Sequence, residues 1–248
     1  MSGHSKWASI KHKKAAVDAQ KGRVFTKMIR EITVAVKHGG DNIDSNIRLR
    51  KAIDEAKNCN MPAENIKRAI QRGTGELPGV SYEEILYEGY GPAGVAVMAN
   101  ILTDNKNRTA AELRKIFQKY GGNMGEAGCV SWMFSSKGLI YIGKKRISEE
   151  DLMSVALDAG AEDIQSDDEN FFHVVTSAHD MEKVKKAIEK IGIDKSEVTM
   201  LPKNYIKLEG HDAEQMMKMM NELDEHEDVQ SVYANFDISE EEMQKAVL

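Results

Sequence analysis

The sequence predicts a multidomain α and α+β protein, with an N-terminal helical domain and two ferredoxin-like α+β domains, one inserted in the other. Charge is segregated: residues 1–75 carry 16 Lys and Arg against 7 Asp and Glu, whereas residues 76–248 carry 18 against 33. Apolar residues recur at helical spacing in the basic part, and strand-like and helix-like segments alternate in the acidic part. These two changes of character indicate a helical head on an α+β body.

The first domain, residues 1–79, is expected to comprise a basic arm and three short helices. Each helix has one apolar face, as helices that pack on one another require. The apolar positions are Phe25, Ile29, Ile32 and Val36, then Leu49, Ala52, Ile53 and Ala56, then Ile66, Ala69 and Ile70. Gly39-Gly40 is expected to end the first helix and Gly73 the third, because glycine is the usual residue at a helix C-terminus.

The remaining residues are expected to form the order βαββαβ twice. The inner copy has strands at 139–142, 164, 171–176 and 198–201, and helices at 148–159 and 180–191. The outer copy has strands at 95–102, 128–134, 205–208 and 229–236, and helices at 105–119 and 212–223. The domains are thus predicted at 80–136 with 203–238, and at 137–202. Residues 239–248 are expected to form a C-terminal helix.

Composition excludes several classes of protein. The longest apolar run, Val95–Leu102, is too short to span a bilayer, and the polar start has no apolar signal-peptide core, so we expect a cytoplasmic protein that does not contact membranes. Cys59 and Cys129 are far apart and form no C-x-x-C, which argues against a disulfide framework and against a cysteine zinc site.

No arrangement of residues indicates catalysis. Gly89–Gly94 matches G-x-G-x-x-G, but Pro92 interrupts it and a strand follows, so a hairpin turn is the better interpretation. The histidines lack H-x-x-x-H and H-E-x-x-H spacing, and neither G-x-S-x-G nor a Walker loop is present. We therefore expect no enzyme activity, catalytic residue, metal site or cofactor. A small-molecule enzyme and a protein-interaction scaffold are the less favoured alternatives.

Two segments have open interpretations. Met216, Met219, Met220 and Leu223 share a helix face that is expected to pack on a sheet, and a partner-binding methionine surface is the alternative. The glycine-rich residues 121–128 form either a mobile projection with Met124 at its apolar tip or a long hairpin connection.

The basic arm and the start of the first helix are the candidate nucleic-acid interface. The predicted contact residues are Lys6, Trp7, Lys11, His12, Lys13, Lys14, Lys21, Arg23, Lys27 and Arg30. Lysine and arginine bind phosphates, and an aromatic ring within a basic segment can stack on an unpaired base. The acidic body would repel nucleic acid and restrict contact to the head. The alternative is a solvated terminus with no particular partner.

Several motifs resemble the YebC family, also called YebC/PmpR. They are Gly3-His4-Ser5-Lys6-Trp7-Ala8-Ser9-Ile10-Lys11-His12-Lys13-Lys14, Asn46-Ile47-Arg48-Leu49-Arg50, Asn65-Ile66-Lys67-Arg68-Ala69-Ile70, Tyr87-Glu88-Gly89-Tyr90-Gly91-Pro92, Thr103-Asp104-Asn105-Lys106-Asn107-Arg108-Thr109 and Gly121-Gly122-Asn123. The resemblance covers essentially the whole chain. It departs from the family pattern at Ile47, where proline is usual, and at Cys129, where serine is usual.

The resemblance implies a cytosolic, non-enzymatic protein of three domains. Members of that family are described as DNA-binding transcriptional regulators, while others act on ribosomes, and mitochondrial relatives activate translation of cytochrome oxidase. The implied partner is therefore DNA or RNA, contacted through the basic head. In the ribosomal alternative, Asn123 and Met124 would contact the translation machinery. The choice between DNA and RNA and the oligomeric state stay open.

Overall fold

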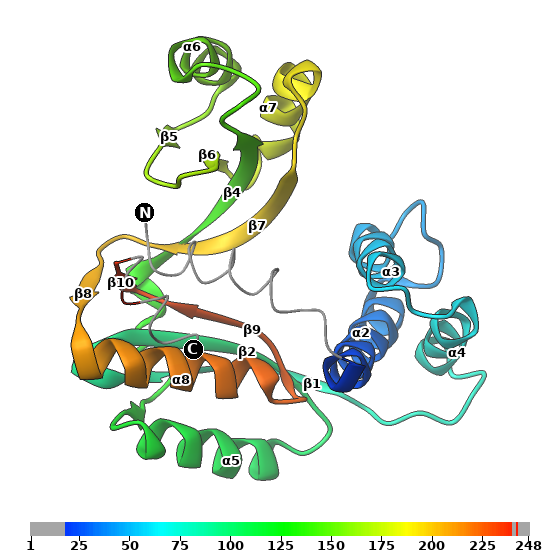
Figure 1. Cartoon of the computed structure of the whole chain (residues 1–248). Coiled ribbons are helices and arrows are strands. Elements are labelled where there is room, and N and C mark those ends of the chain that lie inside the picture. Colours follow the sequence, from blue (N-terminus) through cyan, green and yellow to red (C-terminus); the bar gives the residue numbers. More distant parts are fainter. Residues whose placement is uncertain (1–17, 240–241, 243–248) are drawn as a thin grey trace.

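The computed structural model describes residues 18–239 and residue 242. A group of helices lies apart from the sheets and from the helices that cover those sheets (Figure 1). This arrangement confirms the fold class predicted from the sequence. Most of the basic arm and most of the predicted C-terminal helix lie outside the described residues. Within them, no helix is both long and apolar enough to cross a lipid bilayer.

The part of the head that the structure describes contains three helices, as predicted: α2 (Asp18–Gly39), α3 (Ile47–Asn58) and α4 (Ala63–Thr74). Their apolar faces meet in a core that includes Ile32, Leu49, Ile53 and Ala69. At the start of α3, the Asn46 side chain accepts a hydrogen bond from the Leu49 backbone N–H at 3.0 Å and donates to two carbonyls of the preceding segment. Asparagine capping thus starts the helix at Ile47 without the proline that the family usually carries there.

The expected helix stop at Gly73 is wrong by two residues. Helix α4 continues to Thr74, and Gly75, with a φ of +85°, ends it in the left-handed conformation. Gly73 instead lies where α2 and α4 approach each other. A Cβ atom placed on Gly73 would lie 2.6 Å from the Cβ of Val36 and 2.8 Å from the Thr33 carbonyl oxygen. The glycine is therefore explained by close helix packing rather than by termination.

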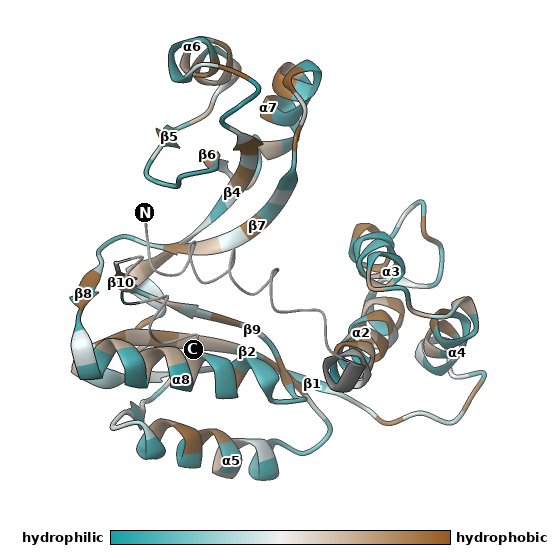
Figure 2. Ribbon diagram, viewed as in Figure 1, coloured by the Kyte–Doolittle hydropathy of each residue, from teal (hydrophilic) through white to brown (hydrophobic). Residues whose placement is uncertain are grey.

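The outer sheet has the strand order β3-β1-β2-β9, and every pairing is antiparallel. Its strands are β1 (Glu83–Tyr90), β2 (Ala96–Thr103), β3 (Asn123–Met124) and β9 (Val229–Ala234). Helices α5 (Lys106–Lys119) and α8 (Gly210–Glu225) pack against it with alternating hydrophobic and hydrophilic positions (Figure 2). Met216, Met217, Met219 and Met220 are at most 1% exposed. The prediction that the methionines pack on a sheet is confirmed, and the partner-binding alternative is wrong.

The strand assignment of the outer sheet needs correction. Residues 128–134 are not a strand: a loop leads into a short 3₁₀ turn, η2 (Ser131–Met133), before β4 begins. The reason is Glu88, whose carboxylate takes the backbone N–H groups of Gly128, Val130 and Ser131, so these cannot join a ladder. Residues 205–208 are expected from the sequence to lie beside β2 in this sheet. That position is taken by β1, which precedes β2 in the chain.

The segment predicted at 205–208 lies outside that sheet. It forms β8 (Ile206–Leu208), which pairs in parallel with β10 (Phe236–Ile238). The turn at Gly89–Gly94 does join β1 to β2, with a 3₁₀ turn, η1 (Pro92–Gly94), between them. This confirms the hairpin interpretation of the G-x-G-x-x-G match.

The inserted sheet has the order β5-β6-β4-β7, all antiparallel, which is the ferredoxin-like order predicted from the sequence. Its strands are β4 (Phe134–Gly143), β5 (Asp163–Gln165), β6 (Phe171–Ser177) and β7 (Lys195–Pro202). Its helices are α6 (Glu149–Ala159) and α7 (Met181–Ile188), followed by the 3₁₀ turn η3 (Glu189–Ile191). Both helices contribute to a single core with one face of the sheet. Ser148 caps α6 by accepting the Asp151 N–H at 3.2 Å.

Candidate nucleic-acid interface

The predicted contact residues divide into two groups. Lys6, Trp7, Lys11, His12, Lys13 and Lys14 lie outside the described residues. Lys21, Arg23, Lys27 and Arg30 lie on α2. The last three recur at spacings of four and three residues, which places them on one face of the helix.

That face of α2 meets the acidic end of α8 and the loop behind it. The Arg23 guanidinium lies 3.0 Å from the Glu225 carboxylate, and Lys27 donates to the Asp224 carbonyl oxygen. Arg30 donates to the Glu227 carbonyl oxygen at 2.7 Å and to the Asp228 carboxylate. The head therefore uses these three cations to hold the body. Their role as phosphate contacts stays a prediction, and the Arg30 side chain, only 10% exposed, is the least accessible of the three.

Asp228 is the centre of this contact between head and body. Its side chain is 2% exposed, and it receives Arg30 on one oxygen and Arg108, Thr103 and Thr109 on the other. Burial alone would raise the pKa of Asp228, but the hydrogen bonds from Thr109 and Arg108 and the charge of Arg30 outweigh it and lower the pKa. Asp228 is thus an ionised, fully partnered carboxylate between two arginines.

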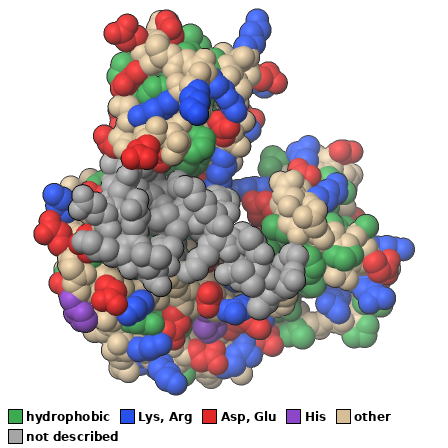
Figure 3. Space-filling model, in the orientation of Figure 1, with side chains coloured by type: hydrophobic (Ala, Val, Ile, Leu, Met, Phe, Trp, Pro, Cys, Tyr) green, Lys and Arg blue, Asp and Glu red, His purple; other side chains and the backbone are tan. Residues whose placement is uncertain are grey.

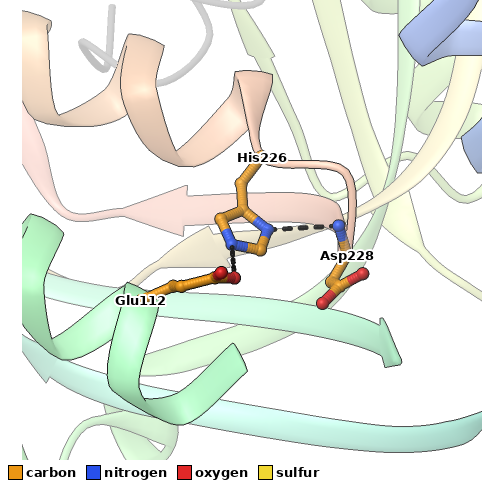
Figure 4. A group of neighbouring side chains, drawn as sticks. All are labelled: Glu112, His226 and Asp228. Atoms are coloured by element: carbon orange, nitrogen blue, oxygen red, sulfur yellow. Dashed lines mark hydrogen bonds and ion pairs between the residues drawn. The ribbon is translucent and has the colours of Figure 1, made fainter. Parts of the chain in front are cut away.

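A histidine with two carboxylates is a possible metal-binding set, and such a set lies beside this contact. Figure 4 shows His226 between the Glu112 carboxylate, 3.0 Å from Nε2, and the Asp228 backbone nitrogen, 3.1 Å from Nδ1. Since the backbone N–H donates to Nδ1, the proton of the neutral ring sits on Nε2 and donates to Glu112. Asp228 is occupied by two guanidinium groups, so the set does not fit a divalent cation and instead fixes the loop after α8.

An open groove of about 740 Å³ runs along the same contact. Its charged lining is mixed rather than uniformly basic: Arg23, Arg30, Arg108 and Lys115 face Asp104, Glu112, Glu222, Glu225, Glu227 and Asp228. A phosphate chain entering it would meet carboxylates as well as cations. The groove is therefore a poor cradle for a polyanion.

Exposed cations that the sequence prediction omitted lie on α3 and α4. Arg50, Lys57, Lys67 and Arg72 are exposed and form no ion pair with any described residue. Arg50 and Lys57 are seven residues apart and so share one face of α3. The charge excess of residues 1–75 already covered these positions, so the same count could have identified them.

The body surface carries both signs of charge. In Figure 3, Lys and Arg side chains lie beside Asp and Glu side chains on the head and on both sheet domains. Many of the body's cations are paired with neighbouring carboxylates, as Lys119 is with Glu222 and Arg146 with Asp194. Exclusion of nucleic acid by the body stays a prediction.

The glycine-rich segment does not project with Met124 at its tip. Asn123 and Met124 form β3 and pair with Tyr90 and Gly89 of β1, and the half-buried Met124 packs against the outer core. A Cβ at Gly89 would lie 2.5 Å from the Asn123 carbonyl oxygen, so this close approach requires glycine. The segment is not a hairpin connection either, because β3 pairs with β1 and the chain then passes through η2 into β4 of the inserted sheet. A partner contact by Asn123, which is exposed, and by Met124 stays a prediction.

Both cysteines are unpaired, as expected. Cys129 lies in the turn after β3, where burial raises the pKa of its thiol. The Cys129 carbonyl oxygen accepts the Tyr90 hydroxyl and the Trp132 indole N–H, each at 3.1 Å. The backbone of Cys129, rather than its side chain, thus makes the connections that hold this turn.

Comparison with known proteins finds relatives that match the head and the body of this chain. The model of the TACO1/YebC protein N-terminal domain matches residues 5–76, and that of the TACO1/YebC second and third domain matches residues 82–236. A protein from Dictyoglomus turgidum is 56% identical over 98% of this chain and 99% of its own length, and one from Geobacter sulfurreducens is 56% identical over 99% of each. Both are named probable transcriptional regulatory protein. The crystal structure of a conserved hypothetical protein from Aquifex aeolicus has a TM-score of 0.81 and 49% identity, and covers 95% of this chain and 98% of that one.

Proposed function

Because the chain belongs to the TACO1/YebC family, we propose that it is a DNA-binding regulator of transcription that holds phosphates through its basic N-terminal region. The observation that carries the proposal is the segregated charge, with 16 Lys and Arg against 7 Asp and Glu in residues 1–75. The names of the relatives, probable transcriptional regulatory protein, support a role in gene expression. Cations concentrated on one part of a protein attract polyanions.

Within the basic region, the proposal assigns first contact to the arm residues and to Lys21. Arg23 and Lys27 have protein acceptors, so nucleic acid would have to compete with the end of α8 for them. The exposed Arg50, Lys57, Lys67 and Arg72 extend the proposed surface over α3 and α4. Contacts of this kind go to phosphates and carry little sequence information.

The proposal includes no catalysis, membrane contact or cofactor, and it places the protein in the cytoplasm, where two free thiols are stable. It keeps the domain division expected from the sequence: a head of residues 1–79, an outer domain of 80–136 with 203–238, an inserted domain of 137–202, and a terminal segment, 239–248.

Charge reversal in the arm tests the proposal. Lys11→Glu, Lys13→Glu and Lys14→Glu together should abolish binding to duplex DNA in a gel-shift assay while leaving the circular dichroism spectrum unchanged. The matched control reverses Lys183, Lys186 and Lys190, which are exposed on α7 and η3 of the inserted domain. Equal affinity of the arm variant and the unmodified protein would refute the proposal.

Crosslinking in cells identifies the physiological target. The protein is crosslinked, recovered, and the attached nucleic acid is sequenced. Recovery of promoter DNA would support transcriptional regulation. Recovery of ribosomal RNA would replace it with the translational alternative.

A further inference from the structure

Trp132 is the most exposed aromatic side chain among the described residues, with 62% of its surface accessible. A single exposed hydrophobic residue is ordinary on a protein surface. Trp132 differs because the turn that carries it is fixed at several points. Its neighbours Val130 and Met133 belong to a hydrophobic cluster beneath β2 that Trp132 does not join.

The turn is fixed from below by Glu88, which is only 4% exposed. The Glu88 carboxylate accepts the N–H groups of Gly128 and Val130 at 2.8 Å and that of Ser131 at 2.7 Å. Burial would raise the pKa of Glu88, but these three backbone donors outweigh it and lower the pKa. An ionised carboxylate on a sheet strand thus anchors the backbone immediately before the tryptophan.

The indole ring itself is also oriented. Its N–H donates to the Cys129 carbonyl oxygen at 3.1 Å, so the polar edge of the ring already has a partner within the turn. What the ring offers to an incoming molecule is therefore its π-face. Pre-orientation of an aromatic side chain lowers the entropy lost when a partner binds.

A cation is bound to the backbone of the same turn. The Lys203 backbone N–H donates to the Met133 carbonyl oxygen at 2.9 Å, and its ammonium donates to the Trp132 carbonyl oxygen at 2.8 Å. An ammonium has three N–H donors, and this hydrogen bond uses one of them. Lys203 is exposed, so the others are open to solvent at the turn that carries the indole. The pair combines a stacking surface with a phosphate donor.

We propose that Trp132 and Lys203 hold one unpaired nucleotide of a single-stranded nucleic acid, with its base stacked on the indole and its phosphate on the ammonium. This proposal rests on the proposed nucleic-acid-binding function and adds a second contact, distant in sequence from the basic arm. Single-strand-binding proteins combine exposed aromatic rings with cations that hold the backbone, and this turn carries one of each. A protein partner would be expected to require further exposed apolar residues around the ring, whereas Val130 is fully buried.

Trp132 can report on its own contact by fluorescence, because the chain has only one other tryptophan, Trp7. In a Trp7→Phe protein, all indole emission comes from Trp132. Three probes are used: oligouridylate, oligothymidylate and a mixed-sequence DNA duplex. Both single strands have about fifteen nucleotides, a length within the range that single-strand sites cover. Stacking should quench the emission with a single strand and not with the duplex. RNA and DNA strands are titrated separately to identify the source of the unpaired base.

Affinity measurements complete the test. Trp132→Ala should weaken single-strand binding about 5- to 150-fold, the range for loss of one stacked base, and Trp132→Phe should retain most of the affinity. Lys203→Ala should weaken binding and reduce the salt dependence. Val198→Ala, which removes another exposed hydrophobic side chain, is the control and should change nothing.

Two results would overturn the inference. The first is that Trp132 emission does not change at strand concentrations that saturate the protein, and that Trp132→Ala binds as tightly as the unmodified protein. Because binding still occurs in that case, the proposed function would not be affected. The other is equal quenching by the duplex. Failure of the unmodified protein to bind any of the probes would instead count against the proposed function itself.

Discussion

Asp228 shows at the scale of one residue how two parts of the chain are joined. Its carboxylate lies between Arg30 of the head and Arg108 of the body, and two threonine hydroxyls complete its hydrogen bonds. Another pair along the same contact, Arg23 with Glu225, has side chains that are 40% and 50% exposed. A buried, fully hydrogen-bonded ion pair depends on both partners, whereas exposed pairs contribute little.

Asp228→Asn is expected to destabilise the protein by about 3 kcal/mol, because it removes the buried counter-ion of the nearly buried Arg30 and leaves only the exposed Glu227 at 3.7 Å. The free energy of unfolding in urea is the measurement. Glu225→Gln, in the same contact but exposed, is the control and should cost less than about 1 kcal/mol. Similar values for the two variants would contradict the central role given to Asp228.

The pH dependence of stability follows from the same carboxylate. Its folded pKa is lowered, so it stabilises the protein above its unfolded pKa of about 4, and this contribution is lost as the pH falls through the folded pKa. Glu88, whose pKa is also lowered, acts in the same direction. Denaturation measured at decreasing pH should show a steeper loss below about pH 4 for the unmodified protein than for Asp228→Asn. If the two proteins lost stability equally with falling pH, the contribution assigned to Asp228 would be contradicted.

Prediction of single contact residues from the sequence reached its limit on α2. The helical pattern correctly placed Arg23, Lys27 and Arg30 in the first helix, but it gave no sign that they meet residues about two hundred positions later. A lysine or arginine near a terminus has the same local pattern whether it meets a phosphate or a carboxylate. The acceptor is decided by tertiary packing, which local sequence does not encode.

At the scale of elements, the sequence predicted helices and strands correctly where their backbone hydrogen bonds follow the expected helix or sheet pattern. The three head helices and the whole inserted domain follow the predicted order. The sequence failed at residues 128–134, where the distant Glu88 takes three backbone donors that a strand would need. It also failed at β8, which pairs with β10 rather than joining the larger sheet. Both errors come from contacts between segments far apart in the chain.

Helix packing in the head yields a paired prediction about two glycines. Gly73→Ala should destabilise the protein by about 1–3 kcal/mol, because its Cβ would overlap Val36 and the Thr33 carbonyl oxygen. Gly22→Ala, in α2 with no atom within 4 Å of the added Cβ, should stabilise it by about 0.5–1 kcal/mol. Thermal unfolding measures both. Equal shifts in the melting temperature would contradict the packing explanation for Gly73.

At the scale of the whole molecule, the head is basic in composition, but part of its charge is neutralised by the body. Cations on α2 meet the end of α8, while four exposed cations on α3 and α4 have no described acidic partner: Arg50, Lys57, Lys67 and Arg72. The charge available to a polyanion is therefore smaller than the sequence count. It is also distributed differently, with more of it away from α2.

Reversal of the exposed pair Arg50→Glu and Lys57→Glu should weaken duplex binding and make the slope of log K against log salt shallower by about 2, the equivalent of two phosphate contacts. Filter binding between about 50 and 200 mM salt covers the range in which such contacts act. Lys186→Glu with Lys190→Glu changes the net charge equally on the inserted domain and is the control. If both variants behave alike, net charge rather than this surface governs binding.

The inserted sheet enters and leaves the outer domain at one place. Its first and last strands are partners, with Phe134 opposite Pro202, and the residues just outside them, Met133 and Lys203, share a backbone hydrogen bond of 2.9 Å. The two ends of the inserted segment therefore lie side by side. A tight turn joining residue 133 directly to residue 203 would remove the segment without stretching the rest of the chain. Such an insertion can change in size or be lost during evolution without altering the fold of the outer domain.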